Sequence, residues 1–263
     1  MNPFTEDNLV EQTVIKLIKK IWADSACHIN GYTDEEDAKL GREHQGEVVL
    51  KKYLLPALQK LNPDLPDDAL GQAVDAITRD RSNLSGGSAS GGENKNNFLA
   101  VSQMWVVGEM YTRRPDVILF VNGIPLVLLE LKASHKSLAD AHRDNIRDYK
   151  DTIPKLFWYN MGIIISNGIE NKFGSLTSPY EFFNEWKKAE SEGDQPKTDL
   201  TTILNGVCDI TRLLDIFENF ILFDESQAKA KKIVPRYFQY LGVNRAFANV
   251  INRKKLAGKL GVF

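Results

Sequence analysis

The stretch RRPDVILFVNGIPLVLLELK, residues 113–132, holds two apolar runs joined by Asn122-Gly123, a dipeptide typical of a tight hairpin turn. Three charged side chains interrupt it: Asp116 begins the first run, whereas Glu130 and Lys132 end the second. Charged groups are seldom buried in a sheet without a partner or a chemical task. The stretch therefore predicts a central β-hairpin that carries its charges to one edge of the sheet.

The register of the hairpin decides whether its two acids share a face of the sheet. Because side chains alternate along a strand, a two-residue turn at Asn122-Gly123 sets Asp116 on the face away from Glu130. A three-residue loop pairs Phe120 with Ile124 instead. Asp116 is then a diagonal, same-face neighbour of Glu130, roughly 7–8 Å away between α-carbons. A shared site therefore predicts either an odd-length turn or a bulge that shifts the register.

Two carboxylates and an amine at one sheet edge suit metal-dependent hydrolysis of a phosphodiester. Carboxylate oxygens are ligands for a hard cation such as Mg²⁺, and no thiol or imidazole cluster competes for it. An ammonium group such as that of Lys132 supports developing negative charge. Another interpretation stays open, in which the charges are solvated strand ends and Lys132 pairs with Glu130 or Asp116.

Composition places the chain among ordinary globular proteins. Its 263 residues are 43% hydrophobic and 26% charged. No apolar run approaches the roughly 20 residues that cross a bilayer, and the polar N-terminus is no secretory signal. Cys27 and Cys208 lie far apart without a CxxC pattern, which argues against a disulfide framework or a structural zinc site. These features predict a cytoplasmic protein with two free thiols and no membrane contact.

Charge is unevenly distributed along the chain. Residues 227–263 contain nine Lys or Arg and no Asp or Glu. Residues 1–226 therefore carry a net charge of −11, whereas the whole chain carries −2. A basic segment on an acidic body could contact phosphate, or it could be a solvated terminal helix.

The periodicity of apolar residues predicts an α/β fold with a mixed central sheet flanked by helices. Residues 82–97 are rich in Gly, Ser and Asn, which predicts a mobile loop between a helical part, about 1–81, and a sheet region, about 98–190. Beside the hairpin, strands are expected over residues 98–107, 161–166 and 173–177. Helices are expected to begin at residue 5 and to cover about 44–61, 66–78, 137–151, 180–189 and 200–221.

The spacing Pro115-Asp116, thirteen residues, Glu130-Leu131-Lys132 resembles the PD-(D/E)xK nuclease motif. The surrounding stretch resembles the N-terminal nuclease domain of the type I restriction enzyme R (HsdR) subunit, and the resemblance covers nearly the whole chain. It extends to further stretches: GREHQGEVVLKKYLLPALQKLNPDLP (41–66), NNFLAVSQMWVV (96–107), SNGIENKFGSLTSPYEFFNEW (166–186) and ENFILFDE (218–225).

The resemblance implies roles for individual residues. Asp116 and Glu130 match the metal-binding acids, and Lys132 matches the catalytic lysine. The family's Gln-xxx-Tyr motif, thought to support DNA contact or cleavage, corresponds to Asn145 and Tyr149, so an amide one methylene shorter stands at its first position. Tyr149 could equally pack on the sheet.

Related nucleases often place a glutamate from an early helix near the metal, and Glu11 is the candidate here, although it also suits a solvated helix position. His142 and Arg147 on the helix after the hairpin are candidate phosphate contacts. The four histidines otherwise lack metal-ligand spacing, so capping or surface roles are the alternative for them.

The resemblance implies a restriction-endonuclease-like core and a Mg²⁺-dependent endonuclease, with Mn²⁺ as a substitute, that cuts double-stranded DNA after translocation. The intact subunit would join methylation and specificity subunits. We expect the nuclease domain to span residues 1–225, with 226–263 leading toward an ATP-dependent translocase. No phosphate-binding loop occurs, so no ATP site is expected in this fragment. Alternatives are a catalytically idle nuclease fold that serves as a docking or regulatory module, and a free-standing nuclease.

Overall fold

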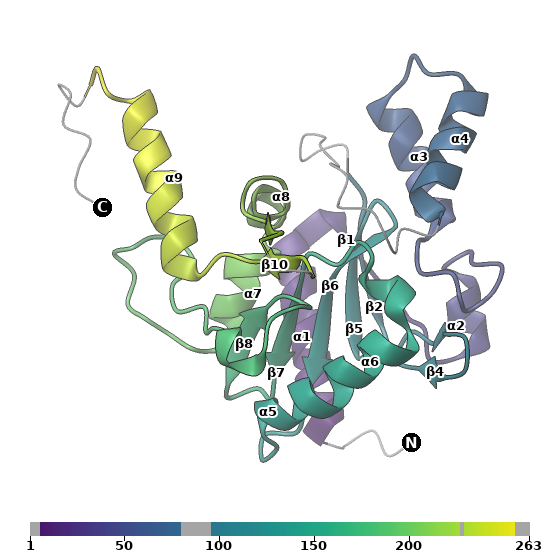
Figure 1. The fold of residues 1–263 in the computed structure, drawn as a ribbon, viewed down its shortest axis with the longest axis horizontal. Helices are drawn as coiled ribbons and strands as arrows, with labels where there is room; N and C mark the ends of the chain where they lie inside the picture. The colour runs from purple at the N-terminus through teal and green to yellow at the C-terminus, as the bar shows by residue number, and fades with distance from the viewer. Residues whose placement is uncertain (1–5, 80–95, 227–228, 256–263) are drawn as a thin grey trace.

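The protein is built around a six-stranded mixed sheet (Figure 1). The computed structural model describes residues 6–79, 96–226 and 229–255. The strands of the sheet, in spatial order, are β1 (Ala26–Asn30), β2 (Phe98–Ser102), β5 (Val117–Val121), β6 (Ile124–Leu131), β7 (Gly162–Ser166) and β8 (Asn171–Gly174). The β1/β2 and β6/β7 pairs are parallel and the others antiparallel. The predicted α/β class with a mixed sheet is confirmed.

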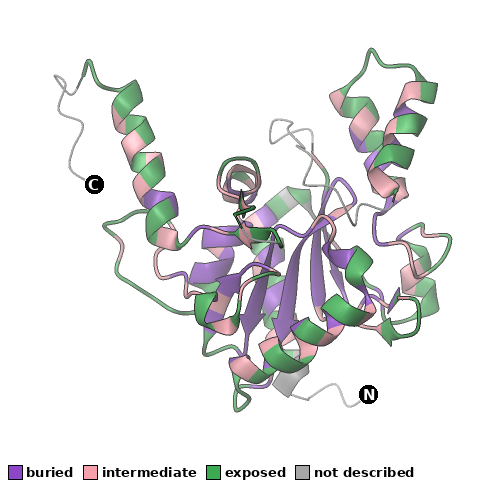
Figure 2. Ribbon diagram, viewed as in Figure 1, coloured by how far each residue is buried: buried purple, intermediate pink, exposed green. Residues whose placement is uncertain are grey.

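Helices cover both faces of the sheet, which explains why the central strands are apolar on both sides (Figure 2). One face packs against α1 (Glu6–Trp22), α7 (Leu200–Cys208) and α8 (Ile210–Asn219). The other packs against a crossover made of α5 (Leu138–Asp140), the π-helical segment η3 (Ala141–Ile146) and α6 (Arg147–Thr152). This crossover joins the parallel strands β6 and β7, as such a connection requires.

Smaller elements surround this core. They are η1 (Ala23–Ser25), α2 (Asp34–Ala38), α3 (Lys51–Leu61), α4 (Asp67–Thr78), β3 (Val106–Val107), β4 (Thr112–Arg113), η4 (Pro154–Phe157), η5 (Tyr180–Phe182), β9 (Leu222–Asp224), β10 (Lys231–Ile233) and α9 (Tyr237–Ile251). The α9 helix extends away from the sheet, toward the C-terminal end of the chain (Figure 1). No helix among the described residues is long and apolar enough to cross a membrane.

Several expected elements differ in the structure. The helix expected over 44–61 begins only at Lys51, because Leu50 is drawn into the core and its backbone N–H donates to Gly123 O at 2.8 Å. The helix expected over 180–189 is limited to η5. The long helix expected over 200–221 is two helices, separated at Asp209, whose side chain accepts from the backbone N–H of Arg212 at 3.2 Å and caps the second.

The strand expected over 98–107 is also interrupted. It ends as β2 at Ser102, and Gln103 adopts a left-handed backbone conformation with φ of 55° before the chain continues into β3. The loop expected over 82–97 lies outside the described residues, except for Asn96 and Asn97. Both contact the side chain of Asn122 in the hairpin turn, at 2.7 and 2.8 Å.

Candidate active site

The register of the β5–β6 hairpin contains a bulge. Val121 pairs with Ile124, so the turn has two residues, Asn122-Gly123, with φ angles of 54° and 77° that fit a type I′ turn. The pairing then shifts by one residue between Leu119 and Phe120. The odd-length turn is thus absent, and the alternative expectation, a register-shifting bulge, is confirmed.

Beyond the bulge the two acids come to the same place on the sheet. Val117 pairs with Leu129, and the same register continued by one residue sets Asp116 opposite Glu130. This is a closer relation than the diagonal one that a three-residue loop would give. Lys132 comes directly after the end of β6, so the course of the chain alone brings the two acids and the lysine together at one edge of the sheet.

Asp116 is held from two directions. Its Oδ2 accepts a hydrogen bond from the backbone N–H of Leu131 at 2.7 Å, which ties the carboxylate to the end of β6. Its Oδ1 lies 3.4 Å from Nε2 of Gln103, and its backbone carbonyl accepts from the N–H of the same residue at 2.8 Å. The carboxylate therefore has a fixed orientation at the edge of the sheet.

Glu130 is a buried acid whose two carboxylate oxygens differ in their hydrogen bonds. Its side chain is 1% exposed. Oε1 accepts from Nζ of Lys132 at 2.9 Å and from Nδ2 of Asn145 at 2.5 Å, whereas the buried Oε2 has no hydrogen-bond partner within the described part of the chain. Burial raises the pKa of Glu130 to about 8; the negative charge of Asp116 adds to the rise and Lys132 opposes it.

The crossover helix brings two further predicted residues to Glu130. Asn145 lies on the π-helical segment η3, a distortion often found at functional sites. The shorter side chain nevertheless reaches the acid. Tyr149, one turn later on α6, is buried. Burial raises the pKa of its phenol, and the charges of Glu130 and Asp116 raise it further, so the group stays protonated beside the acids.

Glu11 reaches the same edge from α1, on the opposite face of the sheet. Its Oε2 accepts a hydrogen bond from Nε2 of Gln103, the same nitrogen that approaches Asp116. Burial raises the pKa of Glu11, and the charge of Asp116 contributes to the rise. The structure thus brings Glu11 close to the first acid of the motif.

His142 and Arg147 do not join this cluster. The Nε2 atom of His142 lies 3.1 Å from the carbonyl of Ser178, and its ring packs edge-on against Phe183. Arg147 is exposed at the start of α6. Among the described residues, no hydrogen bond connects either side chain to Asp116 or Glu130.

Sequence reasoning missed two residues at this edge. Gln103 carries no charge and follows an apolar strand, so only its position after β2 could have singled it out. Arg114 precedes Asp116 by two residues, and its guanidinium carbon lies 4.8 Å from the ring centre of Tyr32 and 4.9 Å from that of Trp105. No ion pair within the described part of the chain includes Arg114, whereas Arg113 forms one with Asp148.

A metal ion bound at this edge would need several ligands from nearby side chains. Within the described residues, no group of three or more His, Cys, Asp or Glu side chains is arranged to hold a metal ion. The pair Asp116 and Glu130 nevertheless fits a hard cation, because both supply carboxylate oxygens and no donor from residues 6–79, 96–226 or 229–255 reaches the buried Oε2 of Glu130.

Known proteins resemble the chain over most of its length. It is 32% identical over 253 residues to the type I restriction enzyme HindI endonuclease subunit of Haemophilus influenzae, covering 82% of this chain and 24% of that protein. It is 28% identical to the putative type I restriction enzyme MjaIXP endonuclease subunit of Methanocaldococcus jannaschii, covering 94% and 28%. The chain thus spans about a quarter of the length of these relatives.

A family model gives the more direct assignment. The model described as "Type I restriction enzyme R protein N terminus" matches residues 3–182. That span contains all the strands of the central sheet and the edge that carries Asp116, Glu130 and Lys132. The chain belongs to the family of type I restriction enzyme R protein N-terminal domains.

Proposed function

We propose that this chain is a Mg²⁺-dependent DNA endonuclease domain that hydrolyses phosphodiester bonds of double-stranded DNA. The observation that carries the proposal is the bulge between Leu119 and Phe120, because it sets Asp116 opposite Glu130 at the edge where Lys132 leaves β6. A packed sheet would bury its apolar faces without this shift of register. The bulge is therefore best explained by the geometry of the site.

Asp116 and Glu130 would hold the metal ion, through carboxylate oxygens that include the buried Oε2. A bound Mg²⁺ would lower the pKa of a water molecule and neutralise charge on the phosphate. Side chains of the protein supply the remaining interactions. The ammonium group of Lys132, 2.9 Å from Oε1 of Glu130, is placed to stabilise negative charge that develops during hydrolysis. Asn145 donates to the same oxygen and fixes its orientation.

The DNA strand would be held by cations that carry no sequence information. Arg114 is suited to this role, because two aromatic rings hold its guanidinium in place and no described residue accepts a hydrogen bond from it. We infer that this domain contacts the DNA backbone and leaves base recognition to other parts of a larger enzyme. We also propose that the domain works in a larger enzyme, together with methylation and specificity subunits and with a translocase to which residues 226–263 lead.

The cleavage site is tested by single substitutions in the assembled restriction enzyme. Asp116→Ala, Glu130→Ala and Lys132→Ala should each lower double-strand cleavage by about 10²–10³ or more, while ATP-driven translocation continues. Asp68→Ala, which removes an exposed carboxylate on α4, is the matched control and should cleave normally. Normal cleavage by all three site variants would show that the chemistry lies elsewhere.

A second candidate function is a catalytically idle docking or regulatory module. It is favoured by the absence of a three-ligand cluster among the described residues, and by the ion pair that already satisfies one oxygen of Glu130. Calorimetry with Mg²⁺ or Mn²⁺ separates the two functions. A nuclease should bind the metal and lose it on Asp116→Asn, whereas an idle module should show no binding.

A further inference from the structure

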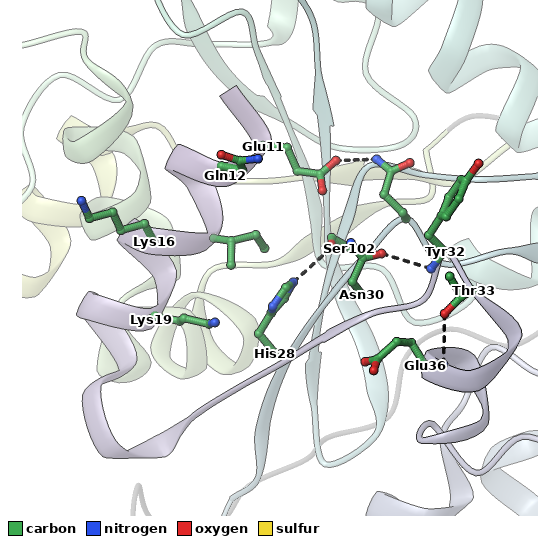
Figure 3. Close-up of a pocket in the computed structure, with 12 residues that line it drawn as sticks. Glu11, Gln12, Lys16, Lys19, His28, Asn30, Tyr32, Thr33, Glu36 and Ser102 are labelled. Atoms are coloured by element: carbon green, nitrogen blue, oxygen red, sulfur yellow. Dashed lines mark hydrogen bonds between the residues drawn. The ribbon is translucent and has the colours of Figure 1, made fainter. Parts of the chain in front are cut away.

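Gln103 occupies an unusual position between two acids that come from different parts of the fold. Glu11 belongs to α1 and Asp116 directly precedes β5, so no common backbone element fixes the distance between their carboxylates. Nε2 of Gln103 donates to Oε2 of Glu11 and lies 3.4 Å from Oδ1 of Asp116. The dashed line at Glu11 in Figure 3 marks the first of these contacts.

The backbone of Gln103 is strained. Its φ of 55° is in the left-handed region, which residues other than glycine rarely adopt. The hydrogen bond from its N–H to the carbonyl of Asp116, at 2.8 Å, and the buried neighbours Ser102 and Met104 hold this conformation. Strained residues of this kind gather at functional sites, where the surrounding structure enforces a geometry that the chemistry needs.

The strain has a geometric consequence. Where β2 ends, a regular strand would keep the side chain of residue 103 in the alternating pattern of the sheet. The left-handed turn instead directs the amide toward the gap between Glu11 and Asp116. The same residue also borders a cavity of about 730 Å³ between α1 and β1, which Glu11, Lys16, His28 and Tyr32 help to line (Figure 3).

We propose that Gln103 is a positioning residue that uses its amide to hold the carboxylates of Glu11 and Asp116 toward one another. Glu11 would then support the proposed metal-holding pair, Asp116 and Glu130, from α1. The inference rests on the proposed nuclease function. A hydrogen-bond donor between two negative groups offsets their repulsion, so the acids stay together before a cation arrives. Without the donor, Glu11 can turn toward solvent on its helix.

Two substitutions separate the amide from the backbone strain. Gln103→Met keeps the length of the side chain and the strained φ but removes the donor. Gln103→Gly removes the donor and also relieves the strain, so its melting temperature should exceed that of the methionine variant by about 2–4 °C. Gln72→Met, on the exposed surface of α4, is the matched control. Each protein is titrated with Mn²⁺ in a calorimeter, beside Asp116→Asn and Glu11→Gln.

Both Gln103 variants should bind Mn²⁺ about 10–100-fold more weakly than the wild type, although only Gln103→Met keeps the strained backbone. Gln103→Met should also cost less affinity in a Glu11→Gln background than in the wild type, since the two residues act together. Wild-type affinity in Gln103→Met, with binding lost in Asp116→Asn, would overturn this inference and leave the proposed function intact. No Mn²⁺ binding by the wild type would contradict both.

Discussion

At the scale of single residues, Glu130 is the most informative group in the protein. It is almost completely buried, and a second acid faces it across the strand pair. One of its oxygens has two donors, and the other has none among the residues that the structure describes. An ionised carboxylate in this position is costly without a cation, since the ammonium of Lys132 compensates only part of its desolvation. The ionised carboxylate should therefore lower the free energy of unfolding of the metal-free protein.

This cost gives a pH-dependent prediction. The pKa of Glu130 is raised to about 8 in the folded protein, from an ordinary value of 4.5. The folded state then binds a proton that the unfolded state releases, so stability from this proton is complete below about pH 4.5 and is lost as pH rises toward 8. Across that window the free energy of unfolding should fall by at most about 1.4 kcal/mol per pH unit.

Glu130→Gln is the control for this effect, because the amide has nearly the same shape and does not titrate. Denaturant unfolding of metal-free protein between pH 5 and 8 should show a shallower decline in the variant. The difference between the two proteins removes the contribution that other titrating groups make to the pH dependence of stability. One such group is His28, whose pKa is lowered to about 4 by burial. Identical slopes would mean that Glu130 has an ordinary pKa in the folded protein.

At the scale of elements, the hairpin and the crossover could be predicted from sequence, and the bulge could not. Apolar runs around Asn122-Gly123 indicate two paired strands whatever their register. The residue of β6 left unpaired opposite Leu119 and Phe120 is Leu126, and its neighbours are apolar too, so alternation gives no sign of a shift. Only the requirement that Asp116 and Glu130 share a face predicted a change of register.

Other elements were missed for identifiable reasons. The edge strand β1 reads Ala-Cys-His-Ile-Asn, which is too short and too mixed in polarity to signal a strand. The π-helical segment η3 has no pattern of its own in sequence. Gln103 acquires its place from a left-handed backbone conformation, and sequence rules expect that conformation chiefly at glycine or asparagine. The candidate site was therefore predictable in its charged residues and not in the amides that orient them.

The short β3–β4 hairpin presents two neighbouring arginines in different environments, and this allows a matched test. Arg114 stacks on two rings without an ion pair among the described residues, whereas Arg113 is bound to Asp148. Arg114→Lys should weaken DNA binding because lysine loses the planar stacking, and should leave the salt dependence of binding nearly unchanged because the positive charge is kept.

Arg113→Lys is the control for that substitution. It should leave DNA binding unchanged and alter stability by less than about 1 kcal/mol, since the pair with Asp148 is partly exposed. Fluorescence anisotropy with a labelled duplex at several salt concentrations measures both variants. Equal losses of affinity in the two variants would remove the distinction between them.

At the scale of the whole molecule, the helix α9 extends from the sheet domain. Its first turns pack on the core: Tyr240 lies 4.8 Å from Phe220 and 6.0 Å from Trp186 between ring centres, and Leu241 is buried beside it. Later residues of the helix, including Phe247 and Ile251, are exposed. The domain boundary expected after residue 225 can be tested on this basis.

A chain truncated after residue 225 should lose about 2–5 kcal/mol of unfolding free energy, because it lacks the buried side chains of Tyr240 and Leu241. A chain truncated after Ile251 retains the whole of α9 and should be nearly as stable as the full chain. Urea unfolding of the three proteins gives the comparison. Equal stability of the two truncated chains would place the boundary at residue 225, with α9 belonging to the next unit.

Whether Asp116 and Glu130 form a metal site can be seen in a crystal structure of this chain soaked in Mn²⁺, with anomalous scattering used to locate the ion. We expect one anomalous peak between the carboxylates of Asp116 and Glu130, within coordination distance of Oε2 of Glu130. The peak should disappear in Asp116→Asn. A soaked crystal with ordered Mn²⁺ elsewhere and none at this edge would contradict the assignment of these two acids as a metal site.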